Sequence, residues 1–251
     1  MDLLFEDKNV LVTAASRGLG FGVAEALVNE DANVVICGRT ESSLKDAVAS
    51  LGERGSYFVA DVSSEQGIGH LGSHLAKRGL TLDGLFVNAG GPPPGVFSDL
   101  SEEDWERAFE LTLMSAVRLT RMALPLLKKS DSPSILYSTS ISVKQPIDNL
   151  LLSNTFRPGV IGLMRTLARE IGPEGIRVNA VCPGYIHTQR VKELLSSSER
   201  VEEEIVKRIP LGRMGTIEEF GALCAFLLSP VTSYVHGSLI LVDGGMYKGM
   251  M

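Results

Sequence analysis

Short apolar runs alternate with longer helical patterns from one end of the 251-residue chain to the other. Each run is short and nearly continuously apolar, which is typical of a strand buried on both faces. The strand candidates are Asn9–Ala14, Asn33–Cys37, Ser56–Ala60, Gly84–Asn88, Ser134–Ser138, Ile176–Cys182 and Ser238–Asp243. Between them lie segments in which apolar residues recur with helical spacing, including Gly18–Asn29 and Glu102–Leu127.

This alternation predicts an α/β fold: a doubly wound parallel sheet of about seven strands, with helices on both faces. No linker, low-complexity stretch or repeat divides the chain, so we expect one domain over residues 1–251. The segment "GGPPPG", Gly90–Gly95, lies at a strand end. It is interpreted as a loop because three prolines cannot continue a helix.

Composition and charge exclude several classes of protein. With 44% hydrophobic residues the chain can bury a full core, and its net charge of −6 argues against broad binding to nucleic acid or anionic membranes. A local basic pocket for one small anion is still permitted. Cys37, Cys182 and Cys224 each lie in apolar runs without a CxxC pair, so core packing is expected and a metal site is not.

The N-terminus and the hydropathy pattern bear on location. "MDLLFEDKNV" carries acids where a signal peptide needs a basic region. No apolar run approaches the ~20 residues of a membrane span. We therefore expect a cytoplasmic protein without membrane contact.

A glycine-rich turn follows the first strand candidate, in "TAASRGLG", Thr13–Gly20. Gly18 and Gly20 allow the backbone to approach a pyrophosphate, and the helix that starts there directs its free N–H groups at the anion. An ordinary strand-to-helix turn is the alternative interpretation. The glycine-rich turn lies between the first strand candidate and a helix, and this position favours a dinucleotide site.

The second strand candidate ends at "CGRT", where Gly38 and Arg39 stand in place of the usual acid. An acid there would bind free ribose hydroxyls and repel a 2′-phosphate. Arg39, with Arg17 in the first turn, offers charge-assisted bonds to such a phosphate. Two solvated surface arginines are the alternative. The pair predicts NADP(H) in preference to NAD(H).

Taken together, these motifs resemble those of the classical short-chain dehydrogenase/reductases, over essentially the whole chain. "TAASRGLG" is similar to the family's TGxxxGxG, with Ala14 at its first glycine. "NAG", "PGYIHT", "LGRMGTIEEFGALCAFLLSP" and "GSLILVDGG" also resemble family segments, the last two those of 3-oxoacyl-carrier-protein reductases. The resemblance implies a Rossmann-type fold. The cofactor-binding residues it implies are Thr13, Ser16, Arg17, Gly18, Leu19, Gly20, Arg39, Asp61, Val62, Asn88, Ala89, Gly90, Arg157, Pro183, Gly184, Ile186 and Thr188.

The catalytic positions depart from the family pattern. Family members use a tetrad of Asn, Ser, Tyr and Lys, with the last two as YxxxK. Aligning "GVIGLMRTLARE" with the helix after that motif places Ser153 at the tyrosine and Arg157 at the lysine. Ser140, thirteen residues earlier, matches the serine, and Thr112 falls on the asparagine. The tetrad is therefore Thr112, Ser140, Ser153 and Arg157.

These replacements change the chemistry. A serine hydroxyl is a far weaker acid than a phenol and too short to reach the same carbonyl, so Ser153 is not expected to donate the proton itself. We expect Arg157 to hold the nicotinamide ribose and Ser140 to polarise the carbonyl. Pro158 removes a helical N–H, so the family's pose is not carried over to either replaced residue.

Other residues are weaker candidates for the acid. His187 lies in "PGYIHT", and Tyr137 and Lys144 flank Ser140. Histidine is suited to proton transfer near neutrality. A structural or solvent-facing role is favoured for all three.

Two functions remain open from the sequence. One is an NADP(H)-dependent oxidoreductase acting on a ketone or secondary alcohol, and the other is a catalytically silent NADP(H)-binding sensor or partner subunit. A polar residue at every tetrad position favours the enzyme. The resemblance also implies a small-molecule substrate, a substrate lid within residues 186–210, and a homo-oligomer, either a tetramer or a dimer.

Overall fold

The computed structural model describes residues 1–195 and 199–250, and part of the predicted lid, residues 196–198, lies outside them. Its strands form one all-parallel sheet in the order β3-β2-β1-β4-β5-β6-β7, which confirms the Rossmann-type prediction. The strands are β1 (Asn9–Val12), β2 (Asn33–Gly38), β3 (Gly55–Val59), β4 (Gly84–Val87), β5 (Ser134–Ser138), β6 (Arg177–Pro183) and β7 (Leu239–Val242). Each lies within a predicted run or extends it by one residue.

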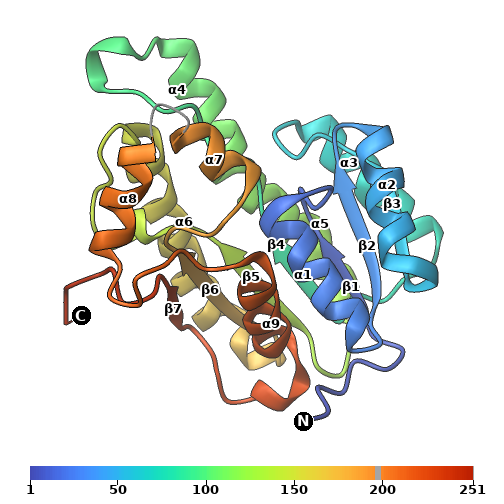
Figure 1. Ribbon diagram of the computed structural model, residues 1–251. Helices are drawn as coiled ribbons and strands as arrows, with labels where there is room; N and C mark the ends of the chain where they lie inside the picture. Colours follow the sequence, from blue (N-terminus) through green and yellow to red (C-terminus); the bar gives the residue numbers. More distant parts are fainter. Residues whose placement is uncertain (196–198, 251) are drawn as a thin grey trace.

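Helices cover both faces of the sheet, as Figure 1 shows. The α-helices are α1 (Gly18–Asn29), α2 (Glu41–Leu51), α3 (Glu65–Lys77), α4 (Glu102–Phe109), α5 (Ser115–Leu127), α6 (Leu151–Glu170), α7 (Gln189–Leu195), α8 (Glu199–Arg208) and α9 (Ile217–Leu228). One core contains α1, α2 and α9, and the other contains α3, α5 and α6. In β1, Leu11 packs into one core and Val10 and Val12 into the other, because side chains alternate along a strand.

The strand order places a crevice at the carboxyl end of β1. This strand pairs with β2 on one side and β4 on the other, so consecutive connections leave it in opposite directions. Ligands of doubly wound sheets bind at such a point. Helices α4, α7 and α8 gather at one end of the molecule, the upper end in Figure 1.

The helical segment predicted over Glu102–Leu127 is not a regular α-helix throughout. A π-helical turn, Glu110–Met114, separates α4 from α5 and contains Thr112. Such turns insert one residue into an α-helix and are frequent at functional sites. In contrast, α6 runs without a break through Pro158. The proline therefore does not displace Ser153 and Arg157 from the helix.

The three cysteines are buried and unpaired with one another, which confirms the prediction of core packing. Burial raises the pKa of Cys37 to about 12. Among the described residues, no helix combines the length and the apolar character that crossing a membrane requires.

Candidate functional site

The ends of β1 and β4 are joined by a pair of hydrogen bonds between Thr13 and Asn88. Thr13 Oγ1 donates to the carbonyl of Asn88 at 2.7 Å and accepts from its backbone N–H at 2.8 Å. The Asn88 amide also donates to the carbonyl of Ala14 at 3.3 Å. These bonds fix the two strand ends that border the crevice.

The turn after β1 is built so that a phosphate group can approach its backbone. Gly18 has a φ of +63°, which favours glycine, and α1 begins there. A Cβ at Gly20 would lie 2.6 Å from the carbonyl oxygen of Ala14 and 2.9 Å from Cα of Ala15. Ala14 itself has a φ of +49°, so alanine occupies a backbone conformation that the family gives to glycine.

The ends of β2 and β3 border the place expected for the adenosine. Arg17 and Arg39 are both exposed, and within the described residues neither forms a salt bridge. At Gly38 a Cβ would lie 3.6 Å from Ser16 Oγ. After β3, Asp61 accepts hydrogen bonds from the backbone and hydroxyl of Ser63, while the neighbouring Val62 is buried.

The segment after β6 lies over the glycine turn. The side chain of Thr188 would be 3.8 Å from a Cβ at Gly18, and its hydroxyl accepts from the Val191 N–H at the start of α7. Ile186 is buried and pairs with Gly215 through an isolated bridge. These residues thus join the first turn to the lid segment. The remaining residues expected at this end of the cofactor are Pro183 and Gly184, at the end of β6.

The arrangement fits a dinucleotide. At Gly20 the start of α1 packs against the backbone of Ala14 and Ala15, which leaves no room for a side chain. A Cβ at Gly18 would meet nothing nearer than 3.8 Å, so the start of the helix is open to a pyrophosphate. Leu19 and Gly20 follow in the first turn of α1, and Ala89 and Gly90 follow β4 on the other side of the crevice. Apart from Arg157, which lies on α6, the predicted cofactor-binding residues therefore lie at the carboxyl ends of strands or in the segments that directly follow them.

Ser153 and Arg157 form one hydrogen-bonded unit in the first two turns of α6. Arg157 Nε donates to Ser153 Oγ at 3.1 Å. Its Nη1 donates to the carbonyls of Ser138, the last paired residue of β5, and of Thr139, which follows it, at 3.3 and 2.9 Å. Burial, reinforced by the positive charge of Arg190, lowers the pKa of Arg157 to about 10. The guanidinium is therefore charged at neutral pH and held in place by the main chain.

Ser140 and Ser153 are linked through Ser142. The hydroxyl of Ser142 lies 3.2 Å from Ser153 Oγ, and its backbone N–H donates to Ser140 Oγ at 3.1 Å. Ser153 is only 7% exposed, whereas Ser140 is half-buried. Among the described residues, the Ser140 hydroxyl donates to no partner, so its proton can serve a ligand.

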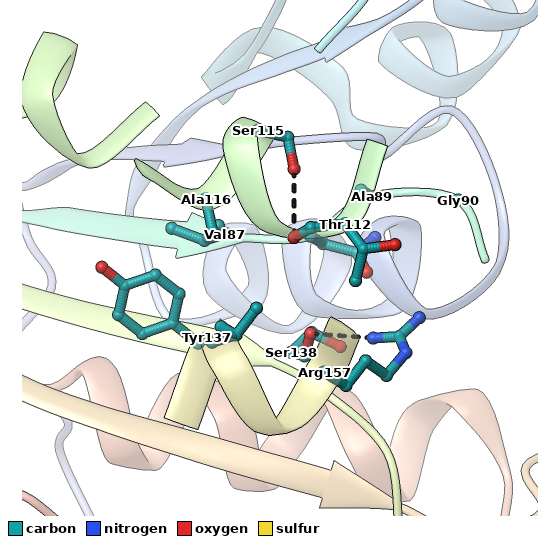
Figure 2. Close-up of a pocket in the computed structure, with 11 residues that line it drawn as sticks. Val87, Ala89, Gly90, Thr112, Ser115, Ala116, Tyr137, Ser138 and Arg157 are labelled. Carbon is teal, nitrogen blue, oxygen red and sulfur yellow. Dashed lines mark hydrogen bonds between the residues drawn. The ribbon is translucent and has the colours of Figure 1, made fainter. Parts of the chain in front are cut away.

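Thr112 and Arg157 line a small cavity below the β4 end. Its volume is about 20 Å³, and its wall includes Gly90, Ser138 and Tyr137. Figure 2 shows the Arg157 guanidinium beneath Thr112 and bonded to Ser138. Thr112 Oγ1 is buried and has no hydrogen-bond partner in the described part of the chain. A cavity of this size has room for about one water molecule.

The alternative acids occupy different environments. The Tyr137 hydroxyl lies 2.6 Å from Thr120 Oγ1 in the core, its pKa raised by burial, and in Figure 2 it points away from Arg157. It is therefore structural. His187 is exposed, and Lys144 is half-buried with its ammonium 5.8 Å from the ring centroid of Tyr247.

One contact at the site was not predicted from the sequence. Arg190, at the start of α7, donates from Nη2 to the carbonyl of Pro92 at 2.7 Å. The neighbouring Gly91 leaves the space for its guanidinium. The only sequence signal was the position of Arg190 directly after "PGYIHTQ". Among the described residues, no group of three or more His, Cys, Asp and Glu side chains is placed to hold a metal ion.

Comparison with known proteins matches this geometry over nearly the full length. The family model described as Enoyl-(Acyl carrier protein) reductase matches residues 13–247. The 3-oxoacyl-[acyl-carrier-protein] reductase FabG of Chlamydia muridarum is 33% identical, covering 98% of this chain and 100% of that protein. Dehydrogenase/reductase SDR family member 4 of Caenorhabditis elegans is 30% identical, with 96% of each chain covered.

A solved structure gives the same result for the fold. L-sorbose reductase from Gluconobacter frateurii, complexed with NADPH and L-sorbose, superposes with a TM-score of 0.94 at 28% identity. The match covers 100% of both chains.

Proposed function

The chain belongs to the short-chain dehydrogenase/reductase family, and we propose that it is an NADP(H)-dependent oxidoreductase acting on a ketone or secondary alcohol. The observation that carries this proposal is the bonded unit of Ser153 and Arg157. Three donor contacts fix the guanidinium beside the half-buried Ser140. A site that had lost its role would have no need to keep a charged group anchored in this position.

The preference for NADP(H) is supported by charge. Arg17 and Arg39 are exposed and unpaired among the described residues, next to the Gly38 position that lacks an acid. Guanidinium groups suit a 2′-phosphate because they donate paired, charge-assisted bonds. The structural relative from Gluconobacter frateurii is complexed with NADPH, which is consistent with this assignment.

The bound cofactor would supply hydride exchange, and the chain would supply position and polarisation. Nη2 of Arg157 makes no hydrogen bond among the described residues, so it is available to hold the nicotinamide ribose. Ser140 would donate a hydrogen bond from its hydroxyl to the substrate carbonyl oxygen and so polarise the carbonyl. Ser153, buried and bonded to Arg157, would be a positioning residue. With Tyr137 in the core, the proton would reach the product from water.

The alternative function is a silent NADP(H)-binding sensor or partner subunit. The absence of the family tyrosine and lysine favours it, and Tyr137 does not replace the missing phenol because its hydroxyl is bonded in the core. Both functions share the same cofactor site. Turnover alone distinguishes them.

The deciding experiment is single-turnover oxidation of NADPH with a panel of carbonyl substrates, including a 3-oxoacyl thioester and L-sorbose. We expect measurable oxidation with at least one substrate. Ser140→Ala should slow it by at least about tenfold while leaving NADPH affinity unchanged, since this serine contacts the carbonyl only. No oxidation with any substrate, despite NADPH binding, would favour the silent binder.

Three further properties are part of the proposal. Helices α7 and α8 would form the lid over a small-molecule substrate, which would enter beside the Gly90–Gly95 loop. We expect a cytoplasmic homo-oligomer, a tetramer or a dimer. Phe109 on α4 is 37% exposed and lies 5.9 Å from the Phe156 ring of α6, so these helices offer an apolar surface to another subunit.

A further inference from the structure

Arg190 reaches from α7 to the loop that follows β4. Its Nη2 donates to the Pro92 carbonyl at 2.7 Å. A Cβ at Gly91 would lie 2.4 to 2.7 Å from Nη2, Cζ and Nε of this guanidinium. Since all three atoms are equally close, the guanidinium plane lies against the glycine, and any larger residue at position 91 would displace it.

Arg157 reaches the same loop from α6. It lines the cavity beside Gly90, as Figure 2 shows. A Cβ at Gly90 would meet nothing within 4 Å, so the space beside this residue is open. Burial is the largest cause that lowers the pKa of Arg157, and the positive charge of Arg190 is the second. The two guanidinium groups therefore lie at adjacent residues of one loop, Arg157 on the cavity that Gly90 lines and Arg190 against Gly91, and their charges repel each other.

In the described chain, the carboxylate whose charge acts on this pair is Glu193, on the Arg190 side. Neither Arg157 nor Arg190 takes part in a salt bridge among the described residues. Glu193, which raises the pKa of Arg190, is exposed on α7 and accepts a hydrogen bond from Gln189. Asp148 acts on Tyr185 instead.

Lys144 adds a third positive charge, which acts on the same buried thiol as Arg157. Burial raises the pKa of the Cys182 thiol to about 11, and the charges of Lys144 and Arg157 both act in the opposite direction. For Arg157 the geometry agrees, because its Nη1 donates to the carbonyl of Thr139, whose Oγ1 lies 3.0 Å from Cys182 Sγ. The region has an excess of positive charge, although the whole chain has a net charge of −6.

We propose that Arg190 and Arg157 bind an anionic oxygen group, a carboxylate or a phosphate, that the substrate carries in addition to its carbonyl. Among the described residues, Arg190 has Nε and Nη1 available beyond its bond to Pro92. Arg157 Nη2 carries two N–H groups, one for the nicotinamide ribose and one for the anion. A guanidinium fork matches both anions, and an anion between two like charges removes their repulsion. This inference rests on the proposed function only in taking the cleft as the substrate site.

The test compares ligands that differ only in charge. Binding of acetoacetate and methyl acetoacetate, levulinate and methyl levulinate, and dihydroxyacetone phosphate and dihydroxyacetone is measured by calorimetry, with and without NADP+. We expect at least one anionic ligand to bind at least about tenfold more tightly than its neutral partner. The carboxylate and phosphate pairs distinguish the two kinds of anion.

Variants of Arg190 test whether this arginine causes the preference for the anionic ligand. Arg190→Gln should remove the preference for the anion, and Arg190→Lys should keep part of it because the charge remains. Arg78→Gln is the matched control, since Arg78 is exposed at the end of α3 and makes no salt bridge in the described chain. Thermal unfolding of each variant verifies that it is folded.

Equal affinity within every pair would overturn the proposal, as would a preference that persists in Arg190→Gln. Failure of the proposed function has a different signature. Charge-selective binding without any NADPH oxidation would reject turnover and leave the anion site in place. NADPH oxidation with neutral ketones alone would support turnover and reject the anion site.

Discussion

Arg157 Nε donates a hydrogen bond to Ser153 Oγ across 3.1 Å, so the two residues that we predict at the family's lysine and tyrosine positions are bonded to each other. This contact uses the serine oxygen as an acceptor. The serine hydroxyl is buried and lies 3.2 Å from Ser142 Oγ. In the proposed mechanism it orients the guanidinium and does not act on the substrate.

The first prediction concerns this serine. Ser153→Ala leaves the Arg157 Nε–H without its acceptor, so we expect the free energy of unfolding to fall by about 1 kcal/mol. Cofactor affinity and single-turnover rate should change little. Chemical denaturation and NADPH titration measure both. Thr155→Ala, an exposed neighbour on the same helix, is the control. Complete loss of turnover with the cofactor still bound would instead identify Ser153 as the acid.

The second prediction concerns the choice of cofactor. Arg39→Ala should weaken NADPH binding by at least about tenfold, roughly 1.4 kcal/mol, and leave NADH binding unchanged. The reason is the loss of charge-assisted bonds that only the 2′-phosphate accepts. Calorimetry with both cofactors measures the difference. Arg54→Ala removes an exposed arginine that pairs with Asp31 and should not alter the preference. An unchanged preference in Arg39→Ala would contradict the assignment.

The third prediction concerns the strained turn. Ala14 has a φ of +49°, a conformation that costs an L-residue about 1–2 kcal/mol. Ala14→Gly removes this strain but loses about 0.5–1 kcal/mol because glycine is freer in the unfolded chain. The net expectation is a gain of up to about 1 kcal/mol in unfolding free energy. Ala15→Gly, at a buried site without positive φ, should destabilise. Destabilisation by Ala14→Gly would refute the strain argument.

The fourth prediction concerns the unpaired hydroxyl in the cavity. Thr112→Val replaces a buried oxygen that has no partner among the described residues with a methyl group of the same shape. We expect the free energy of unfolding to rise by about 1 kcal/mol. Thr120→Val is the opposite case, because its hydroxyl bonds to Tyr137 and Ala116, and it should destabilise. A loss of stability in Thr112→Val would show that ordered water satisfies this hydroxyl.

The fold was readable from the sequence because its signals are local. Strand runs and the helix Gly18–Asn29 follow from the spacing of apolar residues, and the predicted bounds of that helix are those of α1. The π-helical turn at Thr112 has no such signal, since one inserted residue does not change the composition of the helix. Turn residues at the nucleotide end were also readable, because glycine is needed wherever a Cβ would collide.

The side-chain geometry of the site was not readable. Arg157 points to the carbonyls of Ser138 and Thr139, a direction that depends on how close α6 packs to the end of β5. The contact between Arg190 and Pro92 joins residues 98 positions apart in the chain. Sequence spacing carries no information about such a pair until the fold brings the two segments together.

The strand order also has a consequence for how the chain acquires its structure during synthesis. Residues 1–59 contain β1, β2 and β3, which are neighbours in the sheet, so these three strands can pair as soon as they have emerged. The edge of β1 that does not pair with β2 stays unpaired until β4 has been made, because β4 is its neighbour on that edge. An open strand edge is prone to aggregation, and non-local parallel pairing forms slowly. The crevice for the cofactor is thus completed only when β4 docks. Cofactor binding to nascent chains of increasing length would therefore report that docking step.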